Sequence, residues 1–89
     1  MTDSCLQAAA NGHSVVLELL LAGRGDPSLA DEMGLTPLHL AVVQGHPAAI
    51  TALLGAGASP DAADDDGYTP ASEAADIGDP DVLEALGLA

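Results

Sequence analysis

The sequence predicts an all-α repeat fold, in which helix-turn-helix units stack into a solenoid and short hairpin loops join one unit to the next. Three observations lead to this prediction. The chain of 89 residues repeats itself at an offset of 33 residues. Glycine and proline recur at fixed places within each copy. The apolar residues are mostly small, with 18 alanines and a single aromatic residue, which favours closely packed helices over a sheet.

The 33-residue offset aligns the chain with itself without a gap. The matches include glycine and proline pairs, leucines and alanines of the expected helices, and single acids. Examples are Gly12-His13 with Gly45-His46, Gly34-x-Thr36-Pro37 with Gly67-x-Thr69-Pro70, Leu20 with Leu53 and Leu86, Ala8 with Ala41 and Ala74, and Asp31 with Asp64. This regularity indicates three copies, at about residues 1–33, 34–66 and 67–89.

The middle copy shows how each element is expected to form. Thr36-Pro37 predicts a helix start, because a hydroxyl caps free N–H groups and proline suits the first helical position. Gly45 is expected to end this helix, and Pro47 to open a second helix that Gly57 ends. Residues 58–68 contain a proline, four aspartates and a glycine, which is a composition typical of turns. The unit is therefore helix, tight turn, helix and hairpin-like loop.

This pattern resembles the ankyrin repeat. The resemblance is carried by Gly34-Leu35-Thr36-Pro37-Leu38-His39-Leu40-Ala41, Gly45-His46, Leu53-Leu54 and Gly57-Ala58. It covers essentially the whole chain. It implies a single domain over residues 1–89, built from antiparallel helix pairs with hairpins projecting at right angles. It also implies that His39 ties one repeat to the next.

The first copy departs from the motif. Asp3 and Ser4 occupy the places of the threonine and proline, and either side chain is able to cap a helix. Arg24 occupies the place of Gly57, so the turn there is expected to shift by one residue. Leu6, Val15 and Leu19 are expected to leave apolar surface exposed.

The last copy is polar, as expected for an end repeat that has no neighbour on one side. Its acids are Glu73, Asp76, Asp79, Asp81 and Glu84. We expect the first and last copies to cap the stack.

The acidic composition excludes several classes of function. The chain has 14 acids against one basic residue, Arg24, which gives a formal net charge of -13. Binding to nucleic acid or to an anionic membrane needs cations that this chain lacks. No apolar run reaches the roughly 18 residues of a membrane-spanning helix, and the pattern of a signal peptide is missing. The single cysteine favours an intracellular, cytoplasmic location.

The residue patterns predict neither an enzyme nor a cofactor. Asp64, Asp66, Gly67 and Glu73 match four places of a calcium-binding loop, but Ala62 occupies the first place and a proline interrupts the loop. The repeat already accounts for the glycine and the proline. We therefore expect an acidic hairpin tip rather than a calcium site.

The histidines and the cysteine have structural explanations. His13 and His46 occupy the same turn in two copies, where each is expected to bond the backbone of the loop between its helices. His39 belongs to the repeat motif, and Cys5 corresponds to a buried leucine. We expect no metal site and no catalytic pair among them.

The remaining candidate is a surface for another protein. The ankyrin resemblance places partner contacts on the hairpin tips and on the exposed side of each first helix. Carried over by position, the contact residues are Glu32, Met33, Leu35, Val43, Gln44, Asp65, Asp66, Tyr68, Asp76 and Ile77. An apolar centre with an acidic rim on a concave face is typical of protein interfaces. We expect a monomeric protein–protein interaction module whose partner is basic or amphipathic.

Alternatives stay open from the sequence alone. One alternative is that Leu35, Val43 and Tyr68 serve only to pack hairpin against helix, and another is that the acids reflect solvation in a high-salt or GC-rich background rather than recognition. A third is that the chain is a structural segment of a longer ankyrin array or multidomain chain, with no partner of its own. Three repeats are near the minimum for a stable stack.

The charge leads to a first prediction. Repulsion among the 14 acids should destabilise the fold, and salt should screen it, because the Debye length is only about 8 Å at 0.15 M ionic strength. We expect a higher melting temperature in about 1 M NaCl than in about 20 mM NaCl, measured by circular dichroism. A flat response would show that the acids are too widely spaced to repel one another appreciably.

Overall fold

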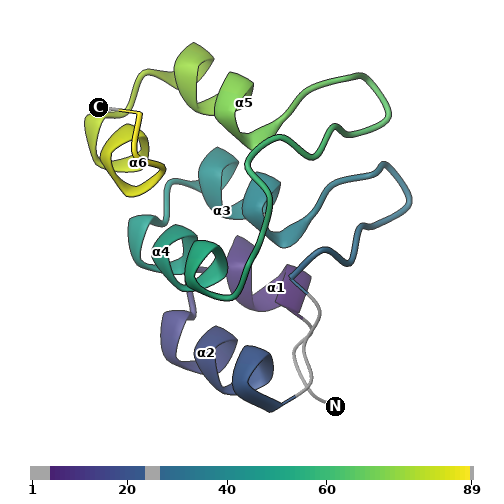
Figure 1. The fold of residues 1–89 in the computed structure, drawn as a ribbon, viewed down its shortest axis with the longest axis vertical. Helices are drawn as coiled ribbons and strands as arrows, with labels where there is room; N and C mark the ends of the chain where they lie inside the picture. Colours follow the sequence, from purple (N-terminus) through teal and green to yellow (C-terminus); the bar gives the residue numbers. More distant parts are fainter. Residues whose placement is uncertain (1–4, 24–26, 89) are drawn as a thin grey trace.

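The computed structural model describes residues 5–23 and 27–88, which form six α-helices arranged in three pairs (Figure 1). The helices are α1 (Cys5–Ala10), α2 (Ser14–Gly23), α3 (Pro37–Gln44), α4 (Pro47–Gly55), α5 (Pro70–Ile77) and α6 (Pro80–Ala85). The all-α repeat architecture predicted from the sequence is confirmed. The expected cap at Asp3 and Ser4 and the turn at Arg24 lie outside the described residues.

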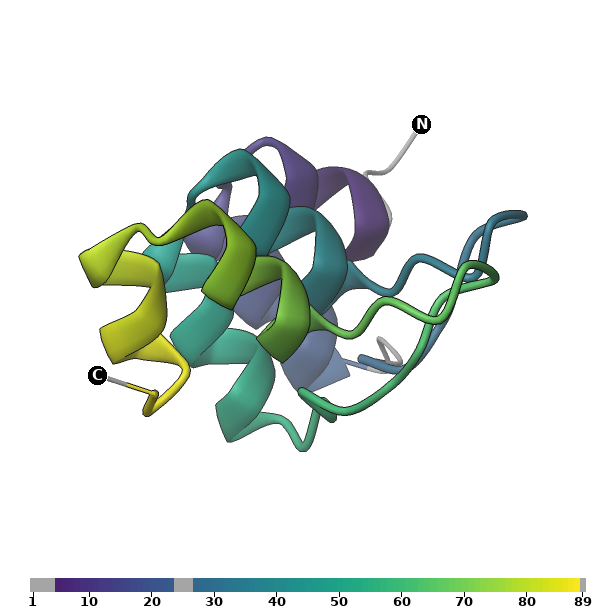
Figure 2. The same cartoon turned by 90° about the horizontal axis from the view of Figure 1, so that it is seen from above.

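The three helix pairs stack on one another in chain order. The first helices α1, α3 and α5 contact one another along one layer, and the second helices α2, α4 and α6 do so along another. The loops that follow α2 and α4, blue and green in Figure 1, leave the stack from the same edge. Seen from above in Figure 2, both loops extend away from the helices. The stack therefore holds the hairpins, and their spacing follows from the spacing of the helix pairs.

Threonine–proline pairs start the first helices of the second and third repeats. The Thr36 hydroxyl accepts a hydrogen bond from the backbone N–H of His39 at 3.4 Å, and the Thr69 hydroxyl accepts one from Ser72 at 3.0 Å. In return, the side chains of His39 and Ser72 accept from the backbone N–H of the capping threonine. These reciprocal bonds satisfy donors that the first turn of a helix leaves unpaired.

Glycines follow the helices of the middle repeat. Gly45 caps α3 with a left-handed φ of 74°, as predicted. For α4 the predicted stop is displaced by one residue: the helix ends at Gly55, Ala56 is its cap, and Gly57 follows with a φ of 95°. Ala56 can serve as the cap because its N–H still bonds to carbonyls of the last turn, so only the next residue needs the left-handed conformation.

Small side chains allow neighbouring helix pairs to approach closely. Ala8, Ala41 and Ala74 occupy the same place in the three repeats, and all three are fully buried. Larger side chains such as Leu17 fill the space between the two layers. Cys5 is buried in the same core, as its correspondence to a leucine predicts. The continuous core thus runs through all three repeats.

His39 joins the second repeat to the third. Its Nδ1 accepts a hydrogen bond from the Thr36 N–H at 3.1 Å, and its Nε2 donates to the carbonyl oxygen of Tyr68 at 2.8 Å. The ring is fully buried. Because a backbone N–H only donates and a carbonyl only accepts, these partners require the neutral tautomer with its proton on Nε2. The tie between repeats that the ankyrin resemblance implies is confirmed.

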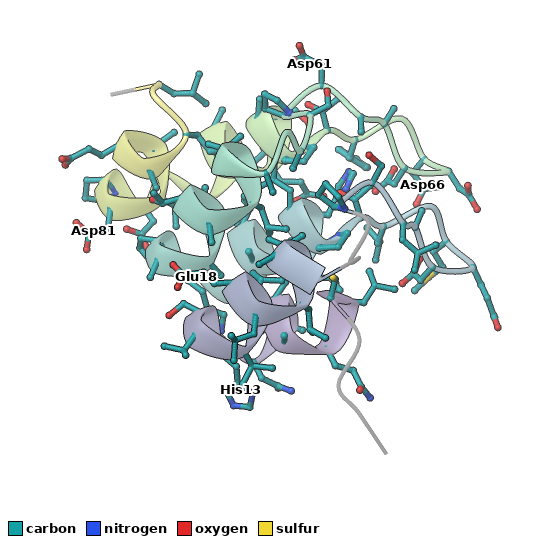
Figure 3. The ribbon with its side chains drawn as sticks, turned by 60° about the horizontal axis from the view of Figure 1, so that its bottom comes forward. His13, Glu18, Asp61, Asp66 and Asp81 are labelled. Carbon is teal, nitrogen blue, oxygen red and sulfur yellow. The ribbon has the colours of Figure 1, made fainter. Side chains whose placement is uncertain are left out.

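His46 links the first two repeats. The sequence predicts a bond to the loop within its own repeat, but Nε2 donates instead to the carbonyl of Ala10, at the end of α1, at 3.1 Å. The reason is the stacking of the two turns: a Cβ built on Gly12 would lie 2.5 Å from the His46 ring. The corresponding side chain in the first repeat, His13, is exposed (Figure 3).

These contacts predict unequal roles for the two linking histidines. His39→Ala should lower the free energy of unfolding by about 2–4 kcal/mol, because it leaves a cavity and unpaired buried groups. His46→Ala should cost about 1 kcal/mol, since it removes one bond from a half-buried ring. Urea unfolding followed by circular dichroism measures both values. Equal losses would contradict the assignment of His39 as the main tie.

Candidate partner-binding surface

The hairpins of the second and third repeats lie side by side. The described part of the first is residues 27–36, and the second is residues 56–69. Figures 1 and 2 both show the two loops running together away from the helices. The backbone N–H of Asp65 donates to the carbonyl of Met33 at 3.0 Å, so the tips are joined directly. The two loops therefore form one paired surface.

An aspartate side chain shapes the first hairpin. Oδ1 of Asp31 accepts hydrogen bonds from the backbone N–H groups of Met33 at 2.8 Å and Leu35 at 3.0 Å. The Asp31 N–H in turn donates to the Leu35 carbonyl at 3.0 Å. A carboxylate that holds nearby backbone donors in this way stabilises a turn, and here it fixes the backbone of two predicted contact residues.

Asp64 has the same role in the second hairpin. Its Oδ1 accepts from the N–H groups of Asp66 and Tyr68, both at 2.9 Å. From the sequence, Asp64 is expected only as an acid of the tip and of the calcium-like pattern, so this structural role was not predicted. The signal was available, because Asp31 and Asp64 match at the repeat offset and each lies four residues before a predicted contact residue.

The paired hairpins carry six of the predicted contact residues. They are Glu32, Met33, Leu35, Asp65, Asp66 and Tyr68. The side chain of Met33 is 61% exposed and that of Tyr68 is 49% exposed, whereas Leu35 is half-buried. The three acids are all exposed, and Figure 3 shows Asp66 pointing away from the body of the molecule.

The other four predicted residues lie at the opposite ends of the first helices. Val43 and Gln44 end α3, and Asp76 and Ile77 end α5; all four are exposed. Because α3 contacts α5, the two helix ends are neighbours. A helix of eight residues is about 12 Å long, so this group is separated from the hairpins by the length of the first helices. The predicted contact residues thus form two patches.

The acids of the second hairpin do not converge. In the described part of the chain, no three histidine, cysteine or acidic side chains are grouped closely enough to hold a metal ion. Oδ1 of Asp64, a residue of the calcium-like pattern, is instead bonded to backbone donors. A hollow that the sequence does not predict lies between α4 and α6, lined by Pro47, Thr51, Asp81, Glu84 and Ala85.

The stacked helix pairs and their joined hairpins define a helical repeat scaffold that displays side chains on ordered loops. The family profile described as ankyrin repeats, in three copies, matches residues 5–87. The chain therefore belongs to the ankyrin repeat family. Ankyrin repeats generally bind other proteins and are typically not enzymes. A search of curated proteins finds no match to the chain. Within the described ranges, every helix is too short or too polar to cross a lipid bilayer.

Two glycines test whether the pairing of the hairpins stabilises the fold. Gly34 and Gly67 are equivalent, with φ values of 79° and 86°. A Cβ on Gly34 would lie 2.9 Å from the backbone nitrogen of Asp65, whereas a Cβ on Gly67 would meet nothing within 4 Å. Both alanine substitutions should cost about 1–2 kcal/mol from the left-handed backbone.

Gly34→Ala should cost about 1 kcal/mol more than Gly67→Ala, because it also pushes the hairpins apart and weakens the bond between Asp65 and Met33. Urea unfolding of the two variants measures this difference. Equal losses would mean that the contact between the tips contributes nothing to stability.

Proposed function

We propose that this chain is a protein–protein interaction module that binds a basic or amphipathic partner through an acidic, apolar-centred concave face. The observation that carries the proposal is the exposure of Met33 and Tyr68 on the paired hairpins. Because these side chains are exposed, they contribute little burial energy to the fold itself and are available to a partner. Tyrosine is enriched among the residues that dominate binding energies, and Tyr68 is the only aromatic residue of the chain.

The order of the hairpins supports this role. The side chains of Asp31 and Asp64 hold the turns, and the bond from Asp65 to Met33 joins them. A surface that is ordered before binding loses less conformational entropy when the partner arrives. The contact residues are therefore presented at a low entropic cost.

The charge of the rim favours a basic partner. Glu32, Asp65 and Asp66 are exposed on the hairpins, and the chain has no lysine and only one arginine with which they could pair. A partner rich in lysine or arginine would relieve the repulsion among these acids. Charges at the rim of an interface also increase the rate of association and disfavour acidic competitors.

The patch at the helix ends extends the surface. Val43 and Ile77 are exposed there beside Gln44 and Asp76. A partner that contacts both patches must present apolar and basic groups over at least the length of a first helix, about 12 Å. An amphipathic segment meets this requirement.

A second candidate function rests on a different observation. Val16 and Leu19 are exposed on α2, at the end of the stack, where a further repeat would find apolar surface to cover. On this reading the chain is a structural segment of a longer ankyrin array or multidomain chain, and its acids serve solvation alone.

We also propose the domain organisation, location and oligomeric state that are expected from the sequence. Residues 1–89 act as one domain, with the first and last repeats as its caps. The protein is intracellular and cytoplasmic, and it is a monomer when dilute.

Affinity capture with matched variants tests the interaction. Wild-type protein, Tyr68→Ala and Asp65→Lys serve as baits in lysate of the source cells, and Asp81→Lys is the control with the same change of charge. Asp81 lies on α6, well away from the hairpin tips (Figure 3). We expect the wild type and Asp81→Lys to capture similar amounts of one partner. Tyr68→Ala should capture about tenfold less of it or lower still, as for a residue at the centre of an interface.

The melting curves of the variants provide the second measurement. Tyr68 and Asp65 are exposed, so their substitution should change stability by no more than about 0.5 kcal/mol. If a partner binds both hairpin variants as well as it binds the wild type, the assigned face is wrong. If nothing is captured by any bait, the structural-segment function is favoured instead.

A further inference from the structure

The first helix pair presents an apolar face at the end of the stack. On α2, Val15 is 68% exposed, Leu19 is 69% exposed and Val16 is 38% exposed. Residues three and four apart lie on the same side of a helix, so the three side chains form one patch. We refer to Val15, Val16 and Leu19 as the α2 patch.

The equivalent positions in α4 and α6 show how the same face of a second helix is used in the other two repeats. Val16 corresponds to Ala49 in α4 and to Val82 in α6, both of which are fully buried. Leu19 corresponds to Ala52 and Ala85, both of which are half-buried. α6 contacts α4 but has no later helix pair beyond it in the structure. Val82 of α6 is therefore covered from the side of the preceding helix pair. Val16 and Leu19 therefore belong to the face with which a second helix docks against another helix pair.

The patch is larger than the corresponding face of an internal repeat. Leucine replaces alanine at position 19, and Val15 stands where Ala48 stands. Ala48 remains exposed although α4 has a neighbouring helix on each side. Val15 therefore lies beyond the area that a stacked repeat covers, which favours an occupant other than a regular preceding repeat.

The described residues of the first helix pair carry few acids. Between Cys5 and Gly23 the only acid is Glu18, whereas the last helix pair and its turn contain five, namely Glu73, Asp76, Asp79, Asp81 and Glu84. Thr51, the counterpart of Glu18, stays exposed between its neighbours, so Glu18 can remain in water when the patch is covered. Two copies that meet at their first repeats would therefore keep their acidic ends far apart.

We propose that the occupant of the α2 patch is a second copy of this chain, bound head to head through the same patch. Each chain contributes Val15, Val16 and Leu19, and the contact is symmetric, so association closes at a dimer. The described structure is 33 Å along its longest axis, which exceeds the Debye length of about 8 Å at 0.15 M salt. Head-to-head contact thus limits the repulsion between two strongly acidic chains.

The dimer is expected to be weak. Three side chains make a patch smaller than the roughly 800 Å² per partner that a standard interface buries. Dissociation constants between about 10 µM and about 1 mM are therefore expected. The monomer is then the main species at low concentration, and the dimer forms as concentration rises.

Sedimentation equilibrium across this concentration range, in about 0.5 M NaCl to screen repulsion, tests the proposal. The wild type should pass from the mass of a monomer to that of a dimer. Leu19→Glu should stay monomeric, because it places a like charge on each side of the contact. Leu88→Glu, which adds the same charge at an exposed leucine near the opposite end of the stack, should dimerise as the wild type does.

The far-ultraviolet circular dichroism of each variant shows that the fold is intact, as expected for substitutions at exposed positions. A wild type that stays monomeric throughout would overturn the proposal, as would a Leu19→Glu variant that dimerises normally. Loss of the dimer in Leu88→Glu, or growth to species larger than a dimer, would indicate head-to-tail stacking instead and would also overturn it.

Discussion

The close stacking of one helix pair on the next is the constraint on which the rest of the structure depends. It requires small side chains where the first helices meet, and Ala8, Ala41 and Ala74 supply them. Once the pairs are at this spacing, the rings of His39 and His46 can reach carbonyl groups of a neighbouring repeat. The same spacing brings the hairpins together. The candidate binding surface, the hydrogen bonds between repeats and the exposed apolar end of the stack all follow from this single packing distance.

Much of this architecture could be predicted from the sequence, because the repeat makes each local signal appear more than once. The start of α3 at Thr36-Pro37 and its stop at Gly45 depend only on backbone chemistry within a few residues. The partner of His46 could not be predicted in the same way, since it belongs to the turn of another repeat. Local rules identify a group that needs a partner, but only the stack determines which carbonyl comes within reach.

The candidate surface, too, could be predicted from the sequence only in part. The exposure of Met33 follows from its place on a hairpin, whereas for Tyr68 the sequence left packing against the helix open, and the structure shows this side chain 49% exposed. Val43 and Ile77 form a separate patch because the length of the first helices lies between them and the hairpins. Contact residues that are assigned by position in the repeat carry no information about this distance. The acids of the hairpins have two kinds of surroundings. Asp31 and Asp64 accept hydrogen bonds from backbone N–H groups, whereas Asp65 and Asp66 are exposed to solvent.

The repeats also provide an internal standard for judging which residues serve the fold and which serve something else. Positions that keep their residue type, such as Ala8 and its equivalents, meet a demand that every repeat shares. Positions at which the residue type differs between repeats are not held to this shared demand. Leu19 against Ala52 and Tyr68 against Leu35 are of the second kind, and the distinguishing residue is the more exposed one in each pair. Leu19 and Tyr68 each belong to a repeat with a neighbour on one side only in the structure, so their exposure marks the two ends of the stack, where the proposed contacts with other molecules lie.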